Sequence, residues 1–223
     1  MSEQVTGAAS PPVRGFPFRI AREGWPFVGV PLVLGLGAIA VGWSFLAVPL
    51  LLLAGFSTWF FRDPERRVPP DPALVVAPAD GKVVEVERLP DGRLRLAIFL
   101  SIFDVHVNRS PVAGHVVRVE HTPGRFLAAW KAETRDVNER NEVVLETDRG
   151  PVRVLQVAGL VARRIVCRAA PGTSLGKGER FGMIRFGSRT ELILPPGASP
   201  AVRVGDTVRG GASVVARWEE PAP

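Results

Sequence analysis

A long uncharged stretch near the N-terminus is the strongest constraint on this chain. No Asp, Glu, Lys or Arg occurs from Pro26 to Phe61, and Leu, Val, Ala and Gly dominate the segment. A single membrane-spanning helix needs roughly 20 apolar residues, so the stretch exceeds one crossing. The sequence "VGWS" near its middle marks a break. We therefore predict a hydrophobic membrane anchor at 25–61, formed by two helices of about 17 residues each in a tight hairpin.

The residues on either side of this stretch support a membrane hairpin. Both flanks carry arginines, namely Arg14, Arg19 and Arg22 before it and Arg62, Arg66 and Arg67 after it. Because positively charged flanks stay on the cytoplasmic side of a membrane, we expect both ends of the hairpin there. The alternative is a buried core hairpin of a soluble protein. A cleaved signal peptide is not expected, since the apolar run is too long.

The rest of the chain divides into a basic segment at 1–24, a proline-rich linker at 62–73 and a β-rich domain at 74–223. Short runs in which Val, Ile and Leu alternate with Arg and Glu predict half-buried strands. The pairs Asp80-Gly81, Asp91-Gly92 and Arg149-Gly150 predict hairpin turns between such runs. The expected fold class is mainly β, a barrel-sandwich-like antiparallel β domain with few helices, preceded by the N-terminal helical hairpin.

Composition narrows the classes of partner. The net charge is +6, but the basic residues are scattered arginines without a dense block or a nucleic-acid-binding motif. Next to a hydrophobic segment, an anionic membrane surface explains this charge better than a nucleic acid does. The single cysteine, Cys167, excludes an internal disulfide, and no pattern typical of a metal site occurs. We therefore expect neither a nucleic acid nor a metal ion as a partner.

The candidate reactive residues are few. His106 is set among Asp104, Asn108 and Arg109 beside an apolar run, whereas His115 and His121 lie on an alternating strand and are interpreted as structural. Ser188, His106 and Asp80 contain the residue types of a nucleophile, a base and an orienting acid. They come from three distant segments, so the sequence leaves open whether they meet. A hydrolase that uses Cys167 with His106 is a further hypothesis, set against a buried, inert thiol.

Several segments together resemble one known family. They read "WFFRDPERRVP", "VVAPADGKVV", "FLSIFDVHVNRSPVAG", "NERNEVVLET", "LQVAGLVARRIVC", "GERFGMIRFGSRTELILP" and "VRVGDTVRGGASVVA". This combination is similar to the short bacterial form of the pyruvoyl-dependent phosphatidylserine decarboxylases. The resemblance implies a proenzyme that cuts itself between Gly187 and Ser188 into a β chain (1–187) and an α chain (188–223). Ser188 would then become the covalent pyruvoyl group, with no added cofactor.

The resemblance also implies a reaction and roles for residues. The pyruvoyl group would form a Schiff base with phosphatidylserine, and loss of carbon dioxide would give phosphatidylethanolamine. Asp80 matches the acid of the family's Asp-His-Ser trio, and His106 is the candidate for the proton transfers. Arg109 stands where longer relatives carry a second histidine. Either His106 serves both steps, which we favour, or His115 or His121 contributes. Arg109 is a candidate contact for the substrate carboxylate or phosphate.

The resemblance fixes the expected partners and location. They are phosphatidylserine in the membrane and the two cleavage products held together as a heterodimer, while a higher oligomer is left open. The expected place is the inner (cell) membrane, with the catalytic domain on its cytoplasmic side. The alternative function is a non-enzymatic, membrane-tethered β-barrel adaptor, which would remain an uncut chain.

Overall fold

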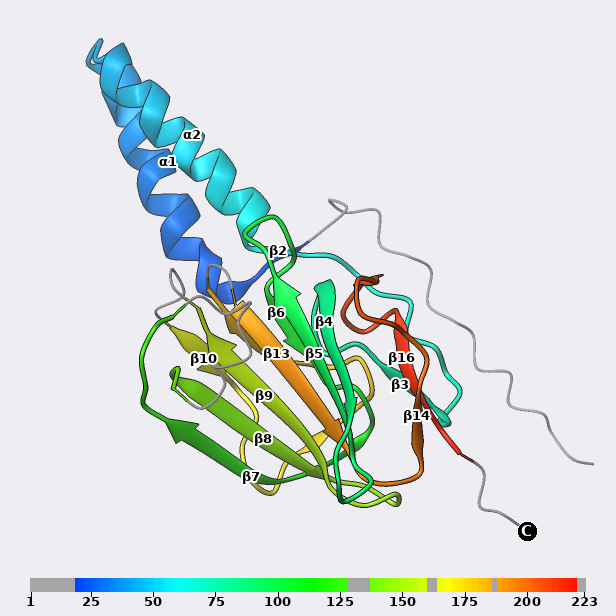
Figure 1. Ribbon diagram of the computed structural model, residues 1–223. Helices are drawn as coiled ribbons and strands as arrows, with labels where there is room; N and C mark the ends of the chain where they lie inside the picture. The colour runs from blue at the N-terminus through cyan, green and yellow to red at the C-terminus, as the bar shows by residue number, and fades with distance from the viewer. Residues whose placement is uncertain (1–18, 128–136, 160–163, 186–187, 220–223) are drawn as a thin grey trace, which may run out of the picture.

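The computed structural model describes residues 19–127, 137–159, 164–185 and 188–219. Two long helices project as a hairpin from one corner of a β-rich domain (Figure 1). The hairpin consists of α1 (Trp25–Ala40), which follows a short 3₁₀ turn, η1 (Arg22–Gly24), and of α2 (Ser44–Phe60). The two helices are joined at residues 41–43, so the predicted break is confirmed.

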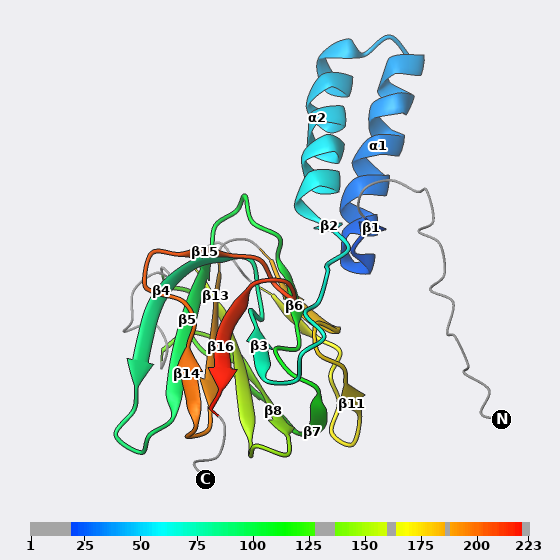
Figure 2. The ribbon, with the colours of Figure 1, turned by 90° about the vertical axis from the view of Figure 1, so that its right-hand side faces the viewer.

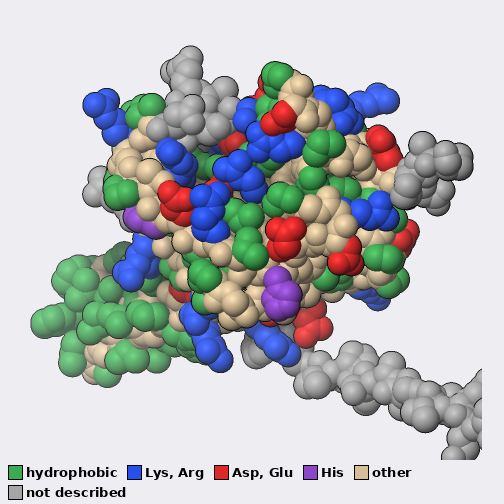
Figure 3. Space-filling view, turned by 90° about the horizontal axis from the view of Figure 1, so that it is seen from below, with side chains coloured by type: hydrophobic (Ala, Val, Ile, Leu, Met, Phe, Trp, Pro, Cys, Tyr) green, Lys and Arg blue, Asp and Glu red, His purple; other side chains and the backbone are tan. Residues whose placement is uncertain are grey.

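Close packing between the two helices depends on a small residue. A Cβ atom added to Gly35 would lie 2.9 Å from Leu51 Cδ2 and 3.3 Å from Leu50 Cβ, so α2 approaches the backbone of α1 at this point. Most of the other apolar side chains of the hairpin face outward, with exposed fractions such as 81% for Phe45 and 69% for Leu52. Apolar side chains accordingly cover the hairpin in Figure 3, whereas the β domain displays mixed charges.

The length of the helices bears on their relation to a membrane. The continuous helical segment Arg22–Ala40 has 19 residues and is long and apolar enough to cross a bilayer, whereas Ser44–Phe60 has 17 residues and falls just short. Large apolar side chains that remain exposed on a helix are costly in water. The hairpin therefore contains one helix with the length of a membrane-spanning segment, and both helices have an apolar surface.

The β domain is built on an eight-stranded sheet that curls around its core. The order of its strands is β11 (Ser174–Leu175), β7 (Gly114–Thr122), β8 (Arg140–Glu146), β9 (Val152–Ala158), β13 (Ser188–Leu194), β5 (Leu94–Leu100), β4 (Gly81–Arg88) and β15 (Thr207–Val208). All the strand pairs in this sheet are antiparallel. The expectation of a mainly β, antiparallel fold is confirmed.

Two smaller antiparallel sheets complete the domain. One contains β10 (Ile165–Cys167), β12 (Arg180–Ile184) and β6 (Val107–Arg109), and the other contains β14 (Ala198–Pro200), β16 (Val214–Trp218) and β3 (Leu74–Val76). A two-residue pair, β1 (Arg19–Ile20) with β2 (Arg62–Asp63), joins the two ends of the helical hairpin. Residues 64–73 connect this pair to the β domain without a helix or strand.

Side chains at alternate positions of the strands form the core. On β13, Leu192 and Leu194 point inward and are fully buried, together with Leu96 and Ile98 of β5 and Val154 of β9. Burial of such side chains contributes about 1.5–3 kcal/mol each to folding. This packing holds the strands of the curled sheet in one register. The register determines which residues of β5 and β9 lie next to each end of β13.

Two of the three predicted hairpin turns are confirmed, and the third is wrong. Asp91-Gly92 joins β4 to β5, and Arg149-Gly150 joins β8 to β9. Asp80-Gly81 instead follows β3 and begins β4, and these two strands pair with different partners. Gly81 has a φ of 144°, and a Cβ there would lie 2.1 Å from the carbonyl oxygen of Phe99. The glycine is required for this close approach and not for a tight turn.

Candidate active site

Ser188 occupies the first position of the central strand β13. It pairs with Leu100 at the end of β5 and with Ala158 at the end of β9, and its side chain is fully buried. Its Oγ atom has no hydrogen-bond partner among the described residues. Most buried hydroxyl groups in proteins are hydrogen-bonded, so an unpartnered one points to a reactive or strained site. Gly187, which precedes it, lies outside the described residues.

His106 is fully buried at the same end of the sheet as Ser188. The chain reaches it six residues after Leu100, the β5 partner of Ser188. The backbone carbonyl of His106 accepts a hydrogen bond from the Ile184 amide at 3.3 Å. Only residues 185–187 separate Ile184 from Ser188, so the fold brings these two predicted site residues to one end of the domain.

The environment of His106 selects one protonation state. Its Nδ1 atom lies 2.9 Å from the carbonyl oxygen of Asp104, which can only accept a hydrogen bond, so Nδ1 carries the proton and Nε2 carries the lone pair. The Phe60 ring lies 4.4 Å from the imidazole, measured between centroids. Burial lowers the pKa of His106 to about 4, although hydrogen bonding and charge from Asp104 oppose the shift. At neutral pH the ring is therefore uncharged, as a base must be.

Asp80 lies at the same end of the sheet, where its carboxylate is bound by Arg66. Both of its oxygen atoms accept hydrogen bonds from Nη2 of Arg66, at 2.9 and 2.7 Å, and Oδ1 also accepts one from the Gly210 amide at 2.8 Å. Burial raises the pKa of Asp80, while the charge of Arg66 opposes this change. Gly81, the residue after Asp80, packs against the carbonyl of Phe99, which precedes Leu100, the β5 partner of Ser188.

Comparison with known proteins identifies the family. The family model described as phosphatidylserine decarboxylase matches residues 53–216. The chain belongs to this family. Its relatives include proteins named phosphatidylserine decarboxylase proenzyme from Symbiobacterium thermophilum, 54% identical over 89% of this chain and 95% of the relative, and from Desulfotalea psychrophila, 42% identical over 88% and 95%. A Burkholderia ambifaria protein of the same name is 44% identical over 90% of this chain and 97% of the relative.

Membership of the phosphatidylserine decarboxylase family establishes the general class of activity. The chain is a decarboxylase that is made as a proenzyme, which confirms the resemblance found in the sequence. The alternative of a non-enzymatic adaptor is thereby set aside. The hydrolase hypothesis based on Cys167 and His106 also loses support, because burial raises the pKa of the Cys167 thiol. In addition, β12 lies between the strand of Cys167 and β6, which His106 precedes.

Arg109 of the decarboxylase is committed to the linker. Its Nη2 atom lies 2.5 Å from Oδ1 of Asp63 and 3.2 Å from the carbonyl oxygen of Pro64, and its Nη1 donates to the Gly178 carbonyl at 3.1 Å. The side chain is only 15% exposed. These contacts favour a structural role for Arg109 over the substrate contact expected from the sequence.

Arg185 is a second cation to consider as a contact for an anionic group, and the sequence did not point to it. It lies three residues before Ser188, and its guanidinium carbon is 5.2 Å from the centroid of the Phe27 ring at the base of α1. Its Nε atom is buried and has no hydrogen-bond acceptor among the described residues. Burial lowers the pKa of Arg185, and the nearby Arg164 adds to this effect. The only available signal in the sequence was its position in "RFGS".

A buried polar chain beneath Ser188 was also missed. Gln156 Nε2 donates to Asn108 Oδ1 at 2.8 Å, Asn141 Nδ2 donates to Gln156 Oε1 at 3.0 Å, and Asn108 Nδ2 donates to Thr190 Oγ1 at 3.2 Å. All four side chains are nearly or fully buried. These hydrogen-bonded side chains connect β6, which follows His106, to β13, which begins at Ser188. They fix the two strands relative to each other.

The other two histidines lie on β7, three strands away from β13 in the sheet. His115 and His121 are both exposed on β7, where His115 lies 3.2 Å from Ser174 Oγ and His121 lies 3.2 Å from Glu139. His115 pairs with Glu146, at the opposite end of the sheet from Ser188. Their structural interpretation is supported, and of the three histidines only His106 is at the site.

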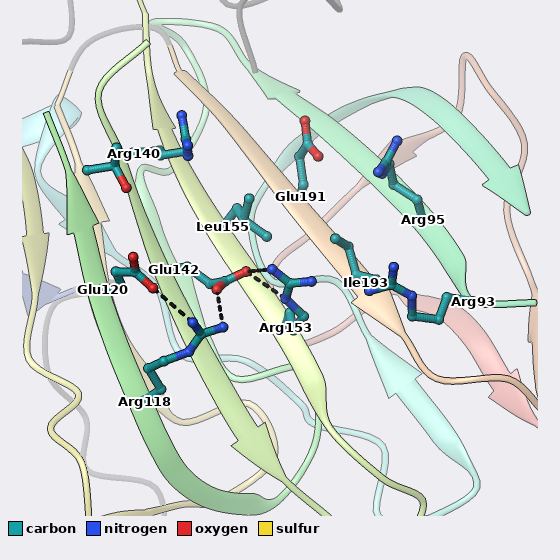
Figure 4. Close-up of a pocket in the computed structure, with 11 residues that line it drawn as sticks. Arg93, Arg95, Arg118, Glu120, Arg140, Glu142, Arg153, Leu155, Glu191 and Ile193 are labelled. Carbon is teal, nitrogen blue, oxygen red and sulfur yellow. Dashed lines mark hydrogen bonds and ion pairs between the residues drawn. The ribbon is translucent and has the colours of Figure 1, made fainter. Parts of the chain in front are cut away.

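The charged pocket in Figure 4 lies on the other face of the sheet. It has a volume of about 330 Å³ and is lined by side chains that include Glu191 and Ile193 of β13. Successive residues of a strand point to opposite faces, so Ser188 shares a face with Leu192 and not with this pocket. Glu142 accepts hydrogen bonds there from Arg118 at 2.8 Å and from Arg153 at 2.6 Å. The pocket is thus bridged by its own ion pairs and is separate from Ser188.

Proposed function

We propose that this chain converts phosphatidylserine into phosphatidylethanolamine with a pyruvoyl group that it makes from its own Ser188. One observation carries the proposal. A buried serine hydroxyl without a partner among the described residues directly follows Gly187, at the end of the sheet where a neutral histidine is also buried. A lone serine in a strand has no structural need for this arrangement. The family name of the matching proteins supplies the substrate.

The first step is cleavage of the proenzyme. Ser188 Oγ attacks the carbonyl carbon of Gly187, Nε2 of His106 accepts the hydroxyl proton, and the amide becomes an ester with a new amino group at position 188. Elimination then breaks the ester bond at the Cβ of residue 188 and releases the Gly187 carboxylate. The enamine that remains takes up one water and loses one ammonia, which leaves the pyruvoyl group. The Gly187 carboxylate keeps the oxygen of Ser188, so cleavage of the chain itself consumes no water. Overall, one water is taken up and one ammonia is released.

The surroundings of Ser188 suit such a group. The residue is held by its strand neighbours Leu100 and Ala158 and excludes water, since its side chain is fully buried. The pyruvoyl group supplies an electron sink for the loss of carbon dioxide. His106 is the residue positioned to hold and return a proton near it. Asp80, with Arg66, completes the charged groups at this end of the sheet.

Both cleavage products are expected to stay together. Strand β13 begins at Ser188 and pairs along its length with β5 and β9 of the other fragment. Cleavage before Ser188 leaves these backbone hydrogen bonds and the core of Leu192 and Leu194 intact. The mature enzyme is therefore proposed to be a heterodimer of fragments 1–187 and 188–223.

The apolar hairpin supports a location of the site at a membrane. We assign α1 and α2 to the inner (cell) membrane and the β domain to its cytoplasmic side, because arginines flank both ends of the hairpin. Arg185 lies against Phe27 at the base of α1, where a phospholipid headgroup would arrive. We assign it, and not Arg109, as the contact for the carboxylate or phosphate of the substrate.

Intact mass under denaturing conditions tests the proposal directly. The wild-type protein should give two fragments, with the smaller one lighter by one ammonia than a peptide that begins with serine. Ser188→Ala should remain a single chain of 24.1 kDa without decarboxylase activity. Ser174→Ala, which removes an exposed hydroxyl from β11, should be cleaved like the wild type. A full-length mass for wild-type protein that releases carbon dioxide from phosphatidylserine would contradict the proposal.

A further inference from the structure

The loop between β5 and β6 exposes two large apolar side chains next to the active site. Phe103 is 66% exposed and Ile102 is 40% exposed, and His106 follows three residues after Phe103. Exposed aromatic side chains at a loop tip are costly in water and are typical of surfaces that contact another apolar phase. Figure 2 shows this loop rising from the domain on the side where the helical hairpin leaves it.

The loop has a defined conformation. Oδ2 of Asp104 accepts hydrogen bonds from both the amide and the hydroxyl group of Ser101, at 2.8 and 2.7 Å, and the Asp104 amide donates to the Ser101 carbonyl at 3.0 Å. These three bonds close a turn whose tip is Ile102 and Phe103. The apolar side chains are therefore presented outward by a fixed turn.

The loop is joined to the base of α2. Nη2 of Arg62 donates to the Phe103 carbonyl at 2.7 Å, Nη1 donates to the Trp59 carbonyl at 2.8 Å, and the guanidinium lies 4.2 Å from the Trp59 ring. The Trp59 and Phe103 rings lie 6.0 Å apart, nearly edge to face. Phe103 is therefore held at the level of Trp59, in the last turn of α2.

The position of Trp59 sets the depth of the loop. If the apolar hairpin enters a bilayer, its last turn lies at the interface, where tryptophan and arginine are the preferred residues. A phenylalanine at the same level, two-thirds exposed, then faces the headgroup region. An apolar side chain and a neighbouring cation, Arg62, match an anionic lipid surface in both hydrophobicity and charge.

We propose that the loop 101–105 is a second membrane contact, in which Phe103 and Ile102 insert into the headgroup region of an anionic bilayer and hold His106 at the lipid surface. The inference rests on the proposed function in so far as the hairpin must enter a membrane. It adds that the catalytic domain is docked against the bilayer and is not merely tethered to it.

A depth-sensitive probe tests the contact. A fluorophore on Phe103→Cys, in the full chain with Cys167→Ser, is compared with the same fluorophore on Val117→Cys, a half-exposed position on β7 away from the hairpin. In vesicles of phosphatidylglycerol and phosphatidylcholine, position 103 should be quenched by lipids that carry a headgroup-level quencher and shielded several-fold from aqueous iodide. Equal iodide access at both positions would overturn the proposal. Shielding at 103 that requires high protein concentration, but not vesicles, would assign the loop to a second copy and also overturn it.

A kinetic test uses no label. The ratio of turnover on bilayer phosphatidylserine to turnover on a dispersed short-chain phosphatidylserine should fall about tenfold in Phe103→Ser, since a buried aromatic ring is lost from the docked state. Phe103→Trp should restore the ratio, and Val117→Ser should leave it at the wild-type value. An unchanged ratio in Phe103→Ser would refute the docking contact while leaving the decarboxylase proposal intact. A shielded probe in a protein that never cleaves itself would support the contact and refute the proposed function.

Discussion

The Nδ1 atom of His106 lies 2.9 Å from the carbonyl oxygen of Asp104, and this contact determines which ring nitrogen is basic. A carbonyl oxygen cannot donate, so the proton is on Nδ1 and the lone pair is on Nε2. Burial keeps the whole ring neutral. An imidazole in this state can accept a proton at neutral pH without first losing one.

The first prediction concerns the pH dependence of self-cleavage. Because burial lowers the pKa of His106 to about 4, the rate of proenzyme cleavage should stay flat from neutral pH down to about pH 5 and fall only as pH approaches 4. Cleavage is followed by gel shift after synthesis of the proenzyme. His121→Gln, which changes an exposed histidine, is the control. A midpoint near 6.5, the ordinary histidine value, would mean that His106 is not the base.

The same pKa has a consequence for stability. The folded-state pKa of about 4 lies below the unfolded value of 6.5, so the folded state binds its proton only at lower pH. The stability from neutral His106 is present above pH 6.5 and is lost as pH falls from there through 4, by about 3 kcal/mol in total. In the uncut Ser188→Ala background, His106→Gln should show a smaller loss of thermal stability between pH 7 and pH 5. Equal losses with and without His106 would refute this assignment.

The buried polar chain should be required for folding. Gln156→Leu leaves Asn108 Oδ1 without its donor and Asn141 Nδ2 without its acceptor. Each buried group left unsatisfied costs about 1–3 kcal/mol. We expect a lower melting temperature and slower self-cleavage, because β6 loses its side-chain hydrogen bond to β9, the strand that pairs with β13 at Ser188. Glu146→Leu, on the exposed surface of β8, is the matched control and should change neither value appreciably.

Substitutions of Arg109 and Arg185 should affect different properties of the enzyme, namely its stability and its KM. Arg109→Ala removes the contacts with Asp63 and Gly178 and should lower stability by about 2 kcal/mol, with the KM for phosphatidylserine unchanged. Arg185→Ala should raise the KM about tenfold or more, since a charge-assisted contact to the substrate would be lost. Steady-state kinetics of cleaved protein on mixed micelles measures both. The reverse pattern would restore the substrate role that the sequence suggested for Arg109.

Gly81 should not tolerate a side chain. In Gly81→Ala, the new methyl group would lie 2.1 Å from the Phe99 carbonyl, so β4 must move away from β5 next to Asp80. We expect a loss of stability of several kcal/mol and little self-cleavage. Gly172→Ala is the control, since Gly172 also has a positive φ, of 86°, but has nothing within 4 Å of the new atom. Similar losses in both variants would show that backbone strain, and not the close approach, sets the requirement.

The hairpin and the β-rich domain were predictable because each follows a simple physical rule. An uncharged run longer than the bilayer is thick, with a break in its middle, can form two packed helices. Alternation of apolar and charged residues predicts a half-buried strand. Asp80-Gly81 failed as a hairpin signal because the same dipeptide also suits a close approach between backbones. The sequence contains nothing that separates these two uses.

The residues of the candidate site could be named only where family motifs covered them. Ser188, His106 and Asp80 came from the resemblance, and the fold brings them to one end of the sheet. Gln156 and Asn141 could not be identified from the sequence, because polar residues on separate strands come within hydrogen-bonding distance only through the register of the strands. The sequence also did not point to Arg185, which we propose in place of Arg109 as the substrate contact, for a similar reason. A sequence does not reveal that Asp63, far away along the chain, already binds Arg109.

The contact between Phe60 and His106 joins the helical hairpin to the β domain, although the two are separate segments of the sequence. Phe60 is the last residue of α2, and its ring centroid lies 4.4 Å from that of the imidazole. Phe60, Phe61, Val105, Val107 and Met183 share one buried cluster. A truncated protein that begins after the helices, made for work in water, would thus lose the aromatic ring that packs against His106. For the same reason, replacing α1 and α2 with an unrelated anchor would change the packing around His106. The helical hairpin and the β domain therefore form one structural unit.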